Sequence, residues 1–258
     1  MQLFRIPMEL IRPRANLLKT VLSAIDKQKL GIENGDILAI ASKAVATFQN
    51  QMTRLDSVEP SERAKKLAGR YDLKPGFVEV VLREADRVYG GVPKALLTLK
   101  DNILTANSGV DRKNAPKGYA IMWPNEPFKT AEELRSRIFE ITSKRVGVMI
   151  VDSRVTPLRL GTTGLALAVA GFEPVKDHRG KRDLYGNTIV ITRHAVADDL
   201  ASAAHLLMGE SDERTPLVLI KDAPVKPTDH VESSSLVIRP KQCLYTKYVL
   251  KGAAKERL

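Results

Sequence analysis

Cysteine, aromatic residues and long apolar runs are all scarce in this sequence of 258 residues. The single cysteine, Cys243, has no partner for an internal disulfide and cannot build a cysteine zinc site. No apolar run reaches the roughly 18 residues of a membrane-spanning helix, and the stretch at 146–151 has the length of a strand. The first residues also lack the apolar segment of a secretory signal peptide. We therefore expect a cytoplasmic protein without a membrane span.

Several common motifs are absent too. The sequence has no G-x-x-x-x-G-K-[ST], no G-x-G-x-x-G after an apolar strand, and no G-x-S-x-G. These absences argue against P-loop proteins, Rossmann dinucleotide enzymes and α/β-hydrolases. The four histidines show no metal-ligand spacing, so we expect His194 and His205 to be surface or core residues.

The composition is that of a globular protein, with 43% hydrophobic and 28% charged residues. The length predicts one or two domains. Lysines and arginines outnumber acids by 41 to 30, and the net charge of +11 indicates an anionic partner. Nucleic acid fits this poorly, because the basic residues are spread along the chain and are not interleaved with aromatics. Anionic small molecules fit better.

Hydrophobic periodicity predicts an α+β protein with mixed sheets and flanking helices. Strands and helices do not alternate regularly, which argues against a doubly wound sheet. Asn16 is expected to cap the first helix, and Thr130 with Glu133 to form a capping box for a later one. The expected strands cover 3–6, 37–42, 95–99, 103–107, 146–151, 188–196 and 217–220; the expected helices cover 16–28, 60–69, 77–85, 130–143 and 197–208.

Acidic side chains follow two of these strands and one helix. Asp152 and Ser153 come after the strand at 146–151, Asp111 lies after the strand at 103–107, and Glu210 lies in the loop after the helix at 197–208. Each acid has a plainer interpretation as a turn cap, an Asx-turn or a solvated loop residue. Together they form a set of hard oxygen ligands suited to Mg²⁺ or Mn²⁺. Spacing alone does not show that they converge.

At this point the chain resembles the coenzyme F420:L-glutamate ligases, a family of γ-glutamyl ligases. The likeness extends to about Asp222 and rests on the order and spacing of six segments, which are GDILAIASK at 35–43, PSERAKKLA at 60–68, ANSGVDRKN at 106–114, KRVGVMIVDS at 144–153, GKRDLYGN at 180–187 and LLMGE at 206–210. The resemblance implies a two-lobed ligase domain over 1–222. Residues 223–258 are then expected to form a C-terminal extension that packs on it.

The resemblance also implies a site. Two metal ions would be held by Asp111, by Asp152 with Ser153, and by Glu210. Nucleotide contacts would come from a short N-terminal segment, a pair after the second strand, an asparagine after the first metal ligand, and the loop that begins at 208. In this sequence they are Pro7, Met8, Glu9 and Leu10; Ser42 and Lys43; Asn114; and Met208, Gly209, Glu210, Ser211, Asp212, Glu213, Arg214 and Thr215.

The implied activity is the GTP-dependent addition of L-glutamate, by a γ-linkage, to the precursor of the deazaflavin coenzyme F420. GTP would convert the acceptor carboxylate into an acyl phosphate, which the glutamate amine then attacks. Phosphoryl transfer needs cations on the phosphate oxygens, and Lys43 and Arg159 are candidate partners of anionic groups, with surface solvation as the alternative for each. The resemblance further implies a homodimer.

This sequence departs from the family pattern at three places. Thr47 stands where the family has a lysine that contacts the nucleotide, Val155 replaces a glycine, and residues 211–213 replace glycines after M-G-E. Two alternatives therefore stay open. The chain could ligate a different acceptor, or it could be a non-catalytic nucleotide- or RNA-binding descendant.

Overall fold

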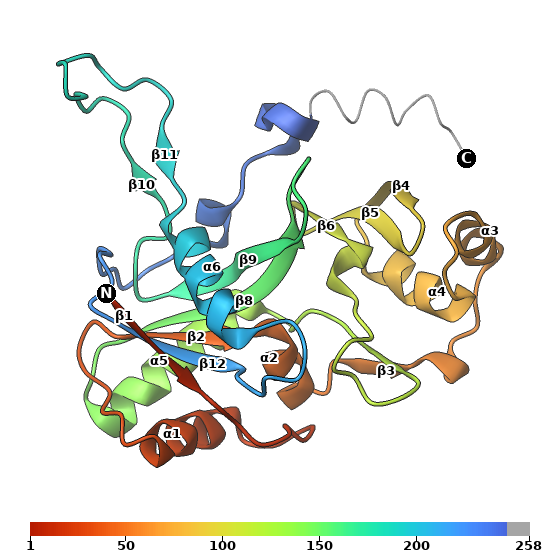
Figure 1. Cartoon of the computed structure of the whole chain (residues 1–258), viewed down its shortest axis with the longest axis horizontal. Helices are drawn as coiled ribbons and strands as arrows, with labels where there is room; N and C mark the ends of the chain where they lie inside the picture. The colour runs from red at the N-terminus through yellow and green to blue at the C-terminus, as the bar shows by residue number, and fades with distance from the viewer. Residues whose placement is uncertain (247–258) are drawn as a thin grey trace.

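The computed structural model describes residues 1–246, and a mixed five-stranded sheet lies at their centre (Figure 1). Its strand order is β1-β12-β2-β8-β9, in which only β2 and β8 are parallel neighbours. The strands are β1 (Gln2–Ile6), β2 (Ile37–Ala41), β8 (Gly147–Val155), β9 (Thr162–Ala170) and β12 (Leu217–Lys221). The predicted α+β class is confirmed. The two-lobed arrangement and the boundary at residue 222 stay predictions.

Helices cover both faces of this sheet because its inner strands are apolar on both sides. In β8, Val148 and Ile150 face one core and Met149 and Val151 face the other. Helices α1 (Leu17–Lys27) and α5 (Pro127–Thr142) pack on the first face, and α6 (Val196–Met208) packs on the second (Figure 1).

The helix starts test the capping predictions. Asn16 caps α1 as predicted, and its side chain accepts a hydrogen bond from the Lys19 N–H at 2.9 Å. The predicted capping box at Thr130 is wrong, because α5 already begins at Pro127. Proline at a helix's first position needs no N–H partner, so the earlier start is favourable. Thr130 instead accepts a hydrogen bond from the Gln49 amide at 3.0 Å.

The long connection between β2 and β8 forms a smaller region with its own core. That core is built from residues 58–120 and includes Leu67, Phe77 and Leu96. The strands predicted at 95–99 and 103–107 are confirmed and pair as a hairpin, in which Asp101 and Asn102 turn the chain with positive φ. The elements of this connection are α2 (Ser42–Phe48), β3 (Met52–Arg54), α3 (Glu62–Arg70), α4 (Pro75–Glu84), β4 (Arg87–Val92), β5 (Ala95–Lys100), β6 (Ile103–Ala106) and β7 (Tyr119–Ile121), with 3₁₀ turns η1 (Leu55–Ser57) and η2 (Asn107–Gly109).

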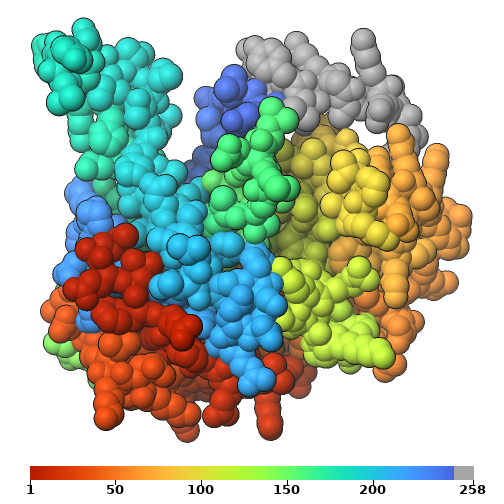
Figure 2. Space-filling view, viewed as in Figure 1, coloured from red at the N-terminus to blue at the C-terminus, as the bar shows by residue number. Residues whose placement is uncertain are grey.

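Residues 173–195 form an arm that stands clear of the body (Figures 1 and 2). The strand predicted over 188–196 is wrong for most of its length. Only β10 (Lys176–Asp177) and β11 (Arg193–His194) pair there. Most other residues between 179 and 195 are exposed, so no second layer covers the alternating apolar side chains. Its tip is ordered locally, because the Asp183 carboxylate accepts the N–H groups of Tyr185 and Asn187.

The segment after β12 runs back over the face that α6 covers. Ala223, Val225 and Leu236 pack against that core, and it contains the 3₁₀ turns η3 (Ser233–Leu236) and η4 (Pro240–Gln242). The apolar piece noted near 243–250 lies mostly outside the described residues. Within residues 1–246, none of the helices combines the length and apolar character that crossing a membrane requires.

Candidate active site

Asp111 is held at its position by a strained loop that follows β6. Gly109 has a φ of 72°, and a Cβ at this position would lie 2.1 Å from the Trp123 indole nitrogen. Only glycine therefore lets the loop pass so close to the ring. Beyond it, Asp111 pairs with Ile121, and its carboxylate accepts the Lys113 N–H at 2.9 Å. The Asx-turn alternative is thus realised, and it fixes the position of the carboxylate.

Asp152 is placed by the alternation of β8. Its side chain points to the same face as Ile150, where the Trp123 indole N–H donates to its carboxylate. Ser153, the next residue, pairs with Gly164 on β9 and contacts the Asp152 carboxylate through its main-chain N–H at 2.9 Å. Ser153 therefore takes part through its backbone.

Glu210 lies just after α6 and is held by three donors. Its carboxylate accepts the Thr162 hydroxyl at 2.7 Å, contacts His205 Nε2 at 2.8 Å, and pairs with the Lys113 ammonium group. His205 was expected to be a surface or core residue rather than a metal ligand, and its contact with Glu210 leaves that expectation in place. The contact depends on the conformation of the loop after α6, so the five-residue spacing of His205 and Glu210 does not predict it.

Two lysines join the three acids into one cluster. Lys43 Nζ lies 2.6 Å from Asp111 Oδ2, and its charge also acts on Asp152. Lys113 pairs with Glu210, and both aspartates raise its pKa further. The sequence motif contained Lys113, but the spacing gave it no role. The structure therefore brings Asp111, Asp152 and Glu210 around two ammonium groups.

The surroundings shift the pKa values of these acids in opposite directions. Burial raises the pKa of Asp152 and outweighs the opposing pull of Lys43 and of the hydrogen bonds to the carboxylate. Burial also raises the pKa of Asp111 and Glu210, but there the neighbouring cations and hydrogen-bond donors have the larger, opposite effect. Lys43 lowers the pKa of Asp111, and the donors around Glu210 lower its pKa to about 2. Charge is therefore least favourable on Asp152.

The segments predicted to contact a nucleotide lie around this cluster. The Met8 N–H donates to the Arg214 carbonyl at 2.8 Å, which joins the N-terminal segment to the loop after α6. The Asn114 amide donates to the Ser211 carbonyl at 2.8 Å, which joins the Asp111 loop to it as well. Ser42, buried at the start of α2, also donates to the Asp152 carboxylate. Glu9 and Leu10 point into solvent.

Two other predicted or flagged residues lie differently. Arg159 is exposed in the turn between β8 and β9, away from the three acids' ion pairs. Thr47 lies one helical turn after Lys43 on α2, and its hydroxyl donates to the Lys43 carbonyl at 2.7 Å. It is therefore satisfied within its own helix.

The carboxylates of the cluster are not arranged as a metal site in this structure. In residues 1–246, no three acidic, histidine or cysteine side chains lie close enough together to hold an ion. Lys43 and Lys113 pair with two of the acids, Asp111 and Glu210. Carboxylate oxygens that gather cations are the ligands that Mg²⁺ and Mn²⁺ prefer.

Comparison with known proteins identifies the family of the chain. The family model described as F420-0:Gamma-glutamyl ligase matches residues 5–222. The chain is 41% identical to the coenzyme F420:L-glutamate ligase of Methanopyrus kandleri, over 82% of each protein. It is 39% identical to the enzyme of that name from Methanocaldococcus jannaschii, over 82% of this chain and 84% of the relative. It is 36% identical to the enzyme of that name from Archaeoglobus fulgidus, over 78% of this chain and 80% of the relative.

The acid and lysine cluster on this α+β frame, taken with these relatives, defines an enzyme of the ligase class. The chain belongs to the F420-0:gamma-glutamyl ligase family, whose model spans both the sheet and the cluster.

Proposed function

We propose that this chain, acting in the cytoplasm as a homodimer, adds L-glutamate by a γ-linkage to the precursor of coenzyme F420, with GTP as co-substrate. An oxygen of the acceptor carboxylate would attack the γ-phosphorus of GTP, giving an acyl phosphate and GDP. The glutamate amine would then attack the acyl carbon, and phosphate would leave as the amide forms and the amine loses a proton.

One observation carries this proposal. Asp111 and Glu210 come from two separate loops and Asp152 from strand β8, yet they gather around Lys43 and Lys113 in a chain that the family model covers from residue 5 to 222. Phosphoryl transfer depends mainly on positioning and on positive charge at the phosphate oxygens. Lys43 and Lys113 are placed to supply such charge beside the acids.

Divalent cations belong to the same proposal. Asp111, Asp152 and Glu210, with the main chain at Ser153, would hold Mg²⁺ or Mn²⁺ at two sites. When bound, these ions would neutralise charge on the transferred phosphate. Lys43 and Lys113 would then be free to turn from the acids to the substrate's anionic groups.

The nucleotide is proposed to lie between the N-terminal segment and the loop that begins at Met208. The hydrogen bond between Met8 and Arg214 connects these two segments. Asn114 connects the Asp111 loop to Ser211, and Ser42 on α2 donates to Asp152. Main-chain amides of such loops are suited to phosphate and base contacts.

A ligation assay tests the proposal. Purified protein is incubated with the deazaflavin precursor, L-glutamate, GTP and Mn²⁺, and products are identified by mass spectrometry. We expect a glutamylated deazaflavin, with GDP and phosphate formed in equal amounts. No product with GTP, or equal product without any nucleotide, would overturn it. Arms with ATP and with other acceptors address the departures at Thr47 and Val155.

A further inference from the structure

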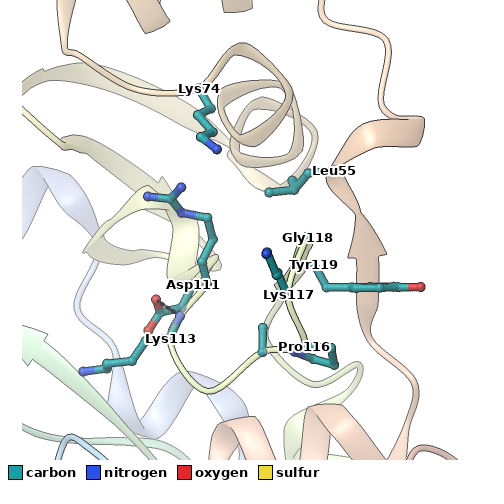
Figure 3. Close-up of a pocket in the computed structure, with 10 residues that line it drawn as sticks. Leu55, Lys74, Asp111, Lys113, Pro116, Lys117, Gly118 and Tyr119 are labelled. Carbon is teal, nitrogen blue, oxygen red and sulfur yellow. Dashed lines mark hydrogen bonds between the residues drawn. The ribbon is translucent and has the colours of Figure 1, made fainter.

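A cavity of about 480 Å³ adjoins the acid cluster and has its own set of cations (Figure 3). It lies between η1, the start of α4 and the loop at 111–119. Asp111 is part of its wall, so the cavity opens beside the proposed reaction centre. Lys74, Arg112 and Lys117 line it as well.

These three cations lack carboxylate partners. Within residues 1–246, no acid lies within ion-pair distance of Lys74, Arg112 or Lys117, whereas neighbouring Lys113 pairs with Glu210. In Figure 3 the amino groups of Lys74 and Lys117 point toward the same open space, and Lys113 extends away from it. Positive charges that converge without acids between them favour an anionic ligand.

The backbone adds to this field. Lys74 is the N-cap of α4, which has no acidic residue in its first turn and no side-chain cap. The positive end of the helix dipole at the cavity wall is therefore not compensated locally. Arg112 is held over the Phe77 ring, with its guanidinium carbon 5.2 Å from the ring centroid, which limits the positions that its charge can take.

Three of the four proposed nucleotide segments lie on other elements, and Asn114, which belongs to the 111–119 loop, is not one of the residues that line the cavity. The N-terminal segment, the start of α2 and the loop after α6 line none of this cavity. The anion bound here is therefore a different one. We propose that Lys74, Arg112 and Lys117 bind an oxyanion group, carboxylate or phosphate, of a substrate other than the nucleotide. The inference rests on the proposed function for the identity of that substrate.

The binding group would orient the substrate toward Asp111. An anion held between Lys74 and Lys117 places the rest of its molecule next to the cluster where ligation is proposed. Such remote contacts fix the geometry of the reacting atoms. The three residues would thus select the substrate without moving protons or phosphate themselves.

The decisive variant is Lys74→Gln/Lys117→Gln, which keeps side-chain length and removes both charges. We expect the KM for the acceptor or for L-glutamate to rise about tenfold or more, and the KM for GTP to change less than twofold. Arg112→Gln should act in the same direction. Lys19→Gln/Lys66→Gln is the matched control, since both lysines are exposed outside the cavity and the net charge changes equally.

The substrate arms distinguish the sources of the oxyanion. A rise confined to the acceptor assigns the site to an acceptor phosphate or carboxylate, and a rise confined to L-glutamate assigns it to a glutamate carboxylate. Unchanged values for both, or a rise in the KM for GTP alone, would overturn the proposal.

A binding experiment separates this proposal from the ligase proposal. Pyrophosphate is titrated into each protein by calorimetry in metal-free buffer. The wild type and the control pair should bind it, and Lys74→Gln/Lys117→Gln should bind about tenfold more weakly. This result would stand even if no glutamylated product forms. No binding to the wild type, or equal binding to all three proteins, would sink the cavity assignment whatever the ligation assay shows.

Discussion

At the scale of single residues, Asp152 lies where burial opposes a charged carboxylate. The Trp123 indole and the Ser153 N–H donate to its carboxylate, yet burial still raises its pKa. A raised carboxyl pKa means that the fold loses stability through this group as the pH rises from the group's unfolded pKa to its folded pKa. A buried carboxyl group with a raised pKa beside Lys43 is typical of a functional position.

Asp152→Asn should therefore separate activity from stability. Ligation should fall by about 100-fold or more, because the amide cannot serve as an anionic ligand for a hard cation. The melting temperature at neutral pH should stay the same or rise, since the amide can still accept the Trp123 hydrogen bond. Turnover by mass spectrometry and thermal unfolding measure the two effects. Asp56→Asn, at an exposed turn, is the control. Wild-type turnover in Asp152→Asn would contradict the assignment.

Thr47 and Lys43 allow a second test at this scale. They are four residues apart on α2, so a lysine at 47 would share the face of Lys43. If the phosphate position near Thr47 lacks a cation, Thr47→Lys should strengthen GTP binding by about tenfold, and the gain should shrink with added salt. Binding is measured by calorimetry at two salt concentrations.

Lys43→Ala supplies the opposing outcome. No gain in Thr47→Lys together with a large loss in Lys43→Ala would show that Lys43 already fills this role from one turn earlier. That result would agree with its contact to Asp111 at 2.6 Å.

At the scale of secondary-structure elements, the contact between β9 and α6 fixes where Glu210 lies. A Cβ on Gly164 would lie 2.3 Å from the main-chain carbonyl of Ala201, so α6 packs directly on the strand backbone. Thr162 on the same strand donates to Glu210 at the end of that helix. The packing of α6 on β9 therefore sets the position of the Glu210 carboxylate.

Gly164→Ala should destabilise the protein by about 1–3 kcal/mol, because α6 must move away from β9. Ligation should fall as well, since Glu210 would move with the helix. Urea unfolding checks the first effect. Gly69→Ala on α3 is the matched control, where nothing lies within 4 Å of an added Cβ and the change should be neutral or stabilising. Equal stability of both variants would contradict this account.

The end of β12 carries a buried ion pair. Lys221 Nζ lies 2.9 Å from the Asp36 carboxylate and also donates to the Gly31 carbonyl at 3.0 Å, with both charged side chains largely shielded from water. Burial opposes the lysine's charge, but Asp36 and Glu33 outweigh it and raise the pKa of Lys221 above 10.5. The pair anchors the turn that leads into β2.

Lys221→Gln should cost about 3 kcal/mol, because it leaves Asp36 buried without its cation. Asp36→Asn/Lys221→Gln should recover much of that loss. A raised lysine pKa contributes stability below the unfolded value and loses it as pH rises through the folded value. The wild type should thus lose stability above pH 10.5 more steeply than Lys221→Gln, as measured by denaturant unfolding across that range. Parallel pH profiles would refute this.

At the scale of the whole molecule, the arm at 173–195 presents four large hydrophobic side chains that are largely exposed. Leu184 and Tyr185 are 101% and 91% exposed, and Val190 and Ile191 are largely exposed too. The arm's tip is nevertheless ordered by hydrogen bonds to Asp183. An ordered apolar projection of this kind fits contact with a second copy, as the proposed homodimer requires.

Leu184→Ser/Tyr185→Ser should shift the protein from dimer to monomer in sedimentation velocity. Its circular dichroism spectrum should not change, because neither side chain packs on the body. Ile141→Ser on α5 removes an exposed apolar side chain elsewhere and should leave the dimer intact. A monomeric wild type, or an unchanged dimer in the arm variant, would refute the arrangement.

The sequence by itself determined the elements whose signals are local. Asn16 capped the predicted helix, the apolar run at 146–151 became a buried strand, and the hairpin at 95–106 formed where predicted. Each depends on hydrogen bonds between residues close in sequence or on hydrophobic periodicity, and both can be recognised in the sequence. The family segments also marked the three acids, but the expectation that Asp152 follows its strand is wrong, because β8 continues to Val155 by pairing with β9.

Only the tertiary structure decided how those acids meet. Lys113, Trp123 and Thr162 reach them from distant parts of the sequence, and His205 reaches Glu210 only through the conformation of the loop after α6. The spacing of these residues in the sequence predicts none of the contacts. The failures have the same cause. The pattern at 188–196 predicts a strand only if a sheet face covers it, and here the segment lies on an arm in solvent. Alternating apolar and polar residues can form a half-buried strand, but tertiary packing determines whether their apolar side chains are buried.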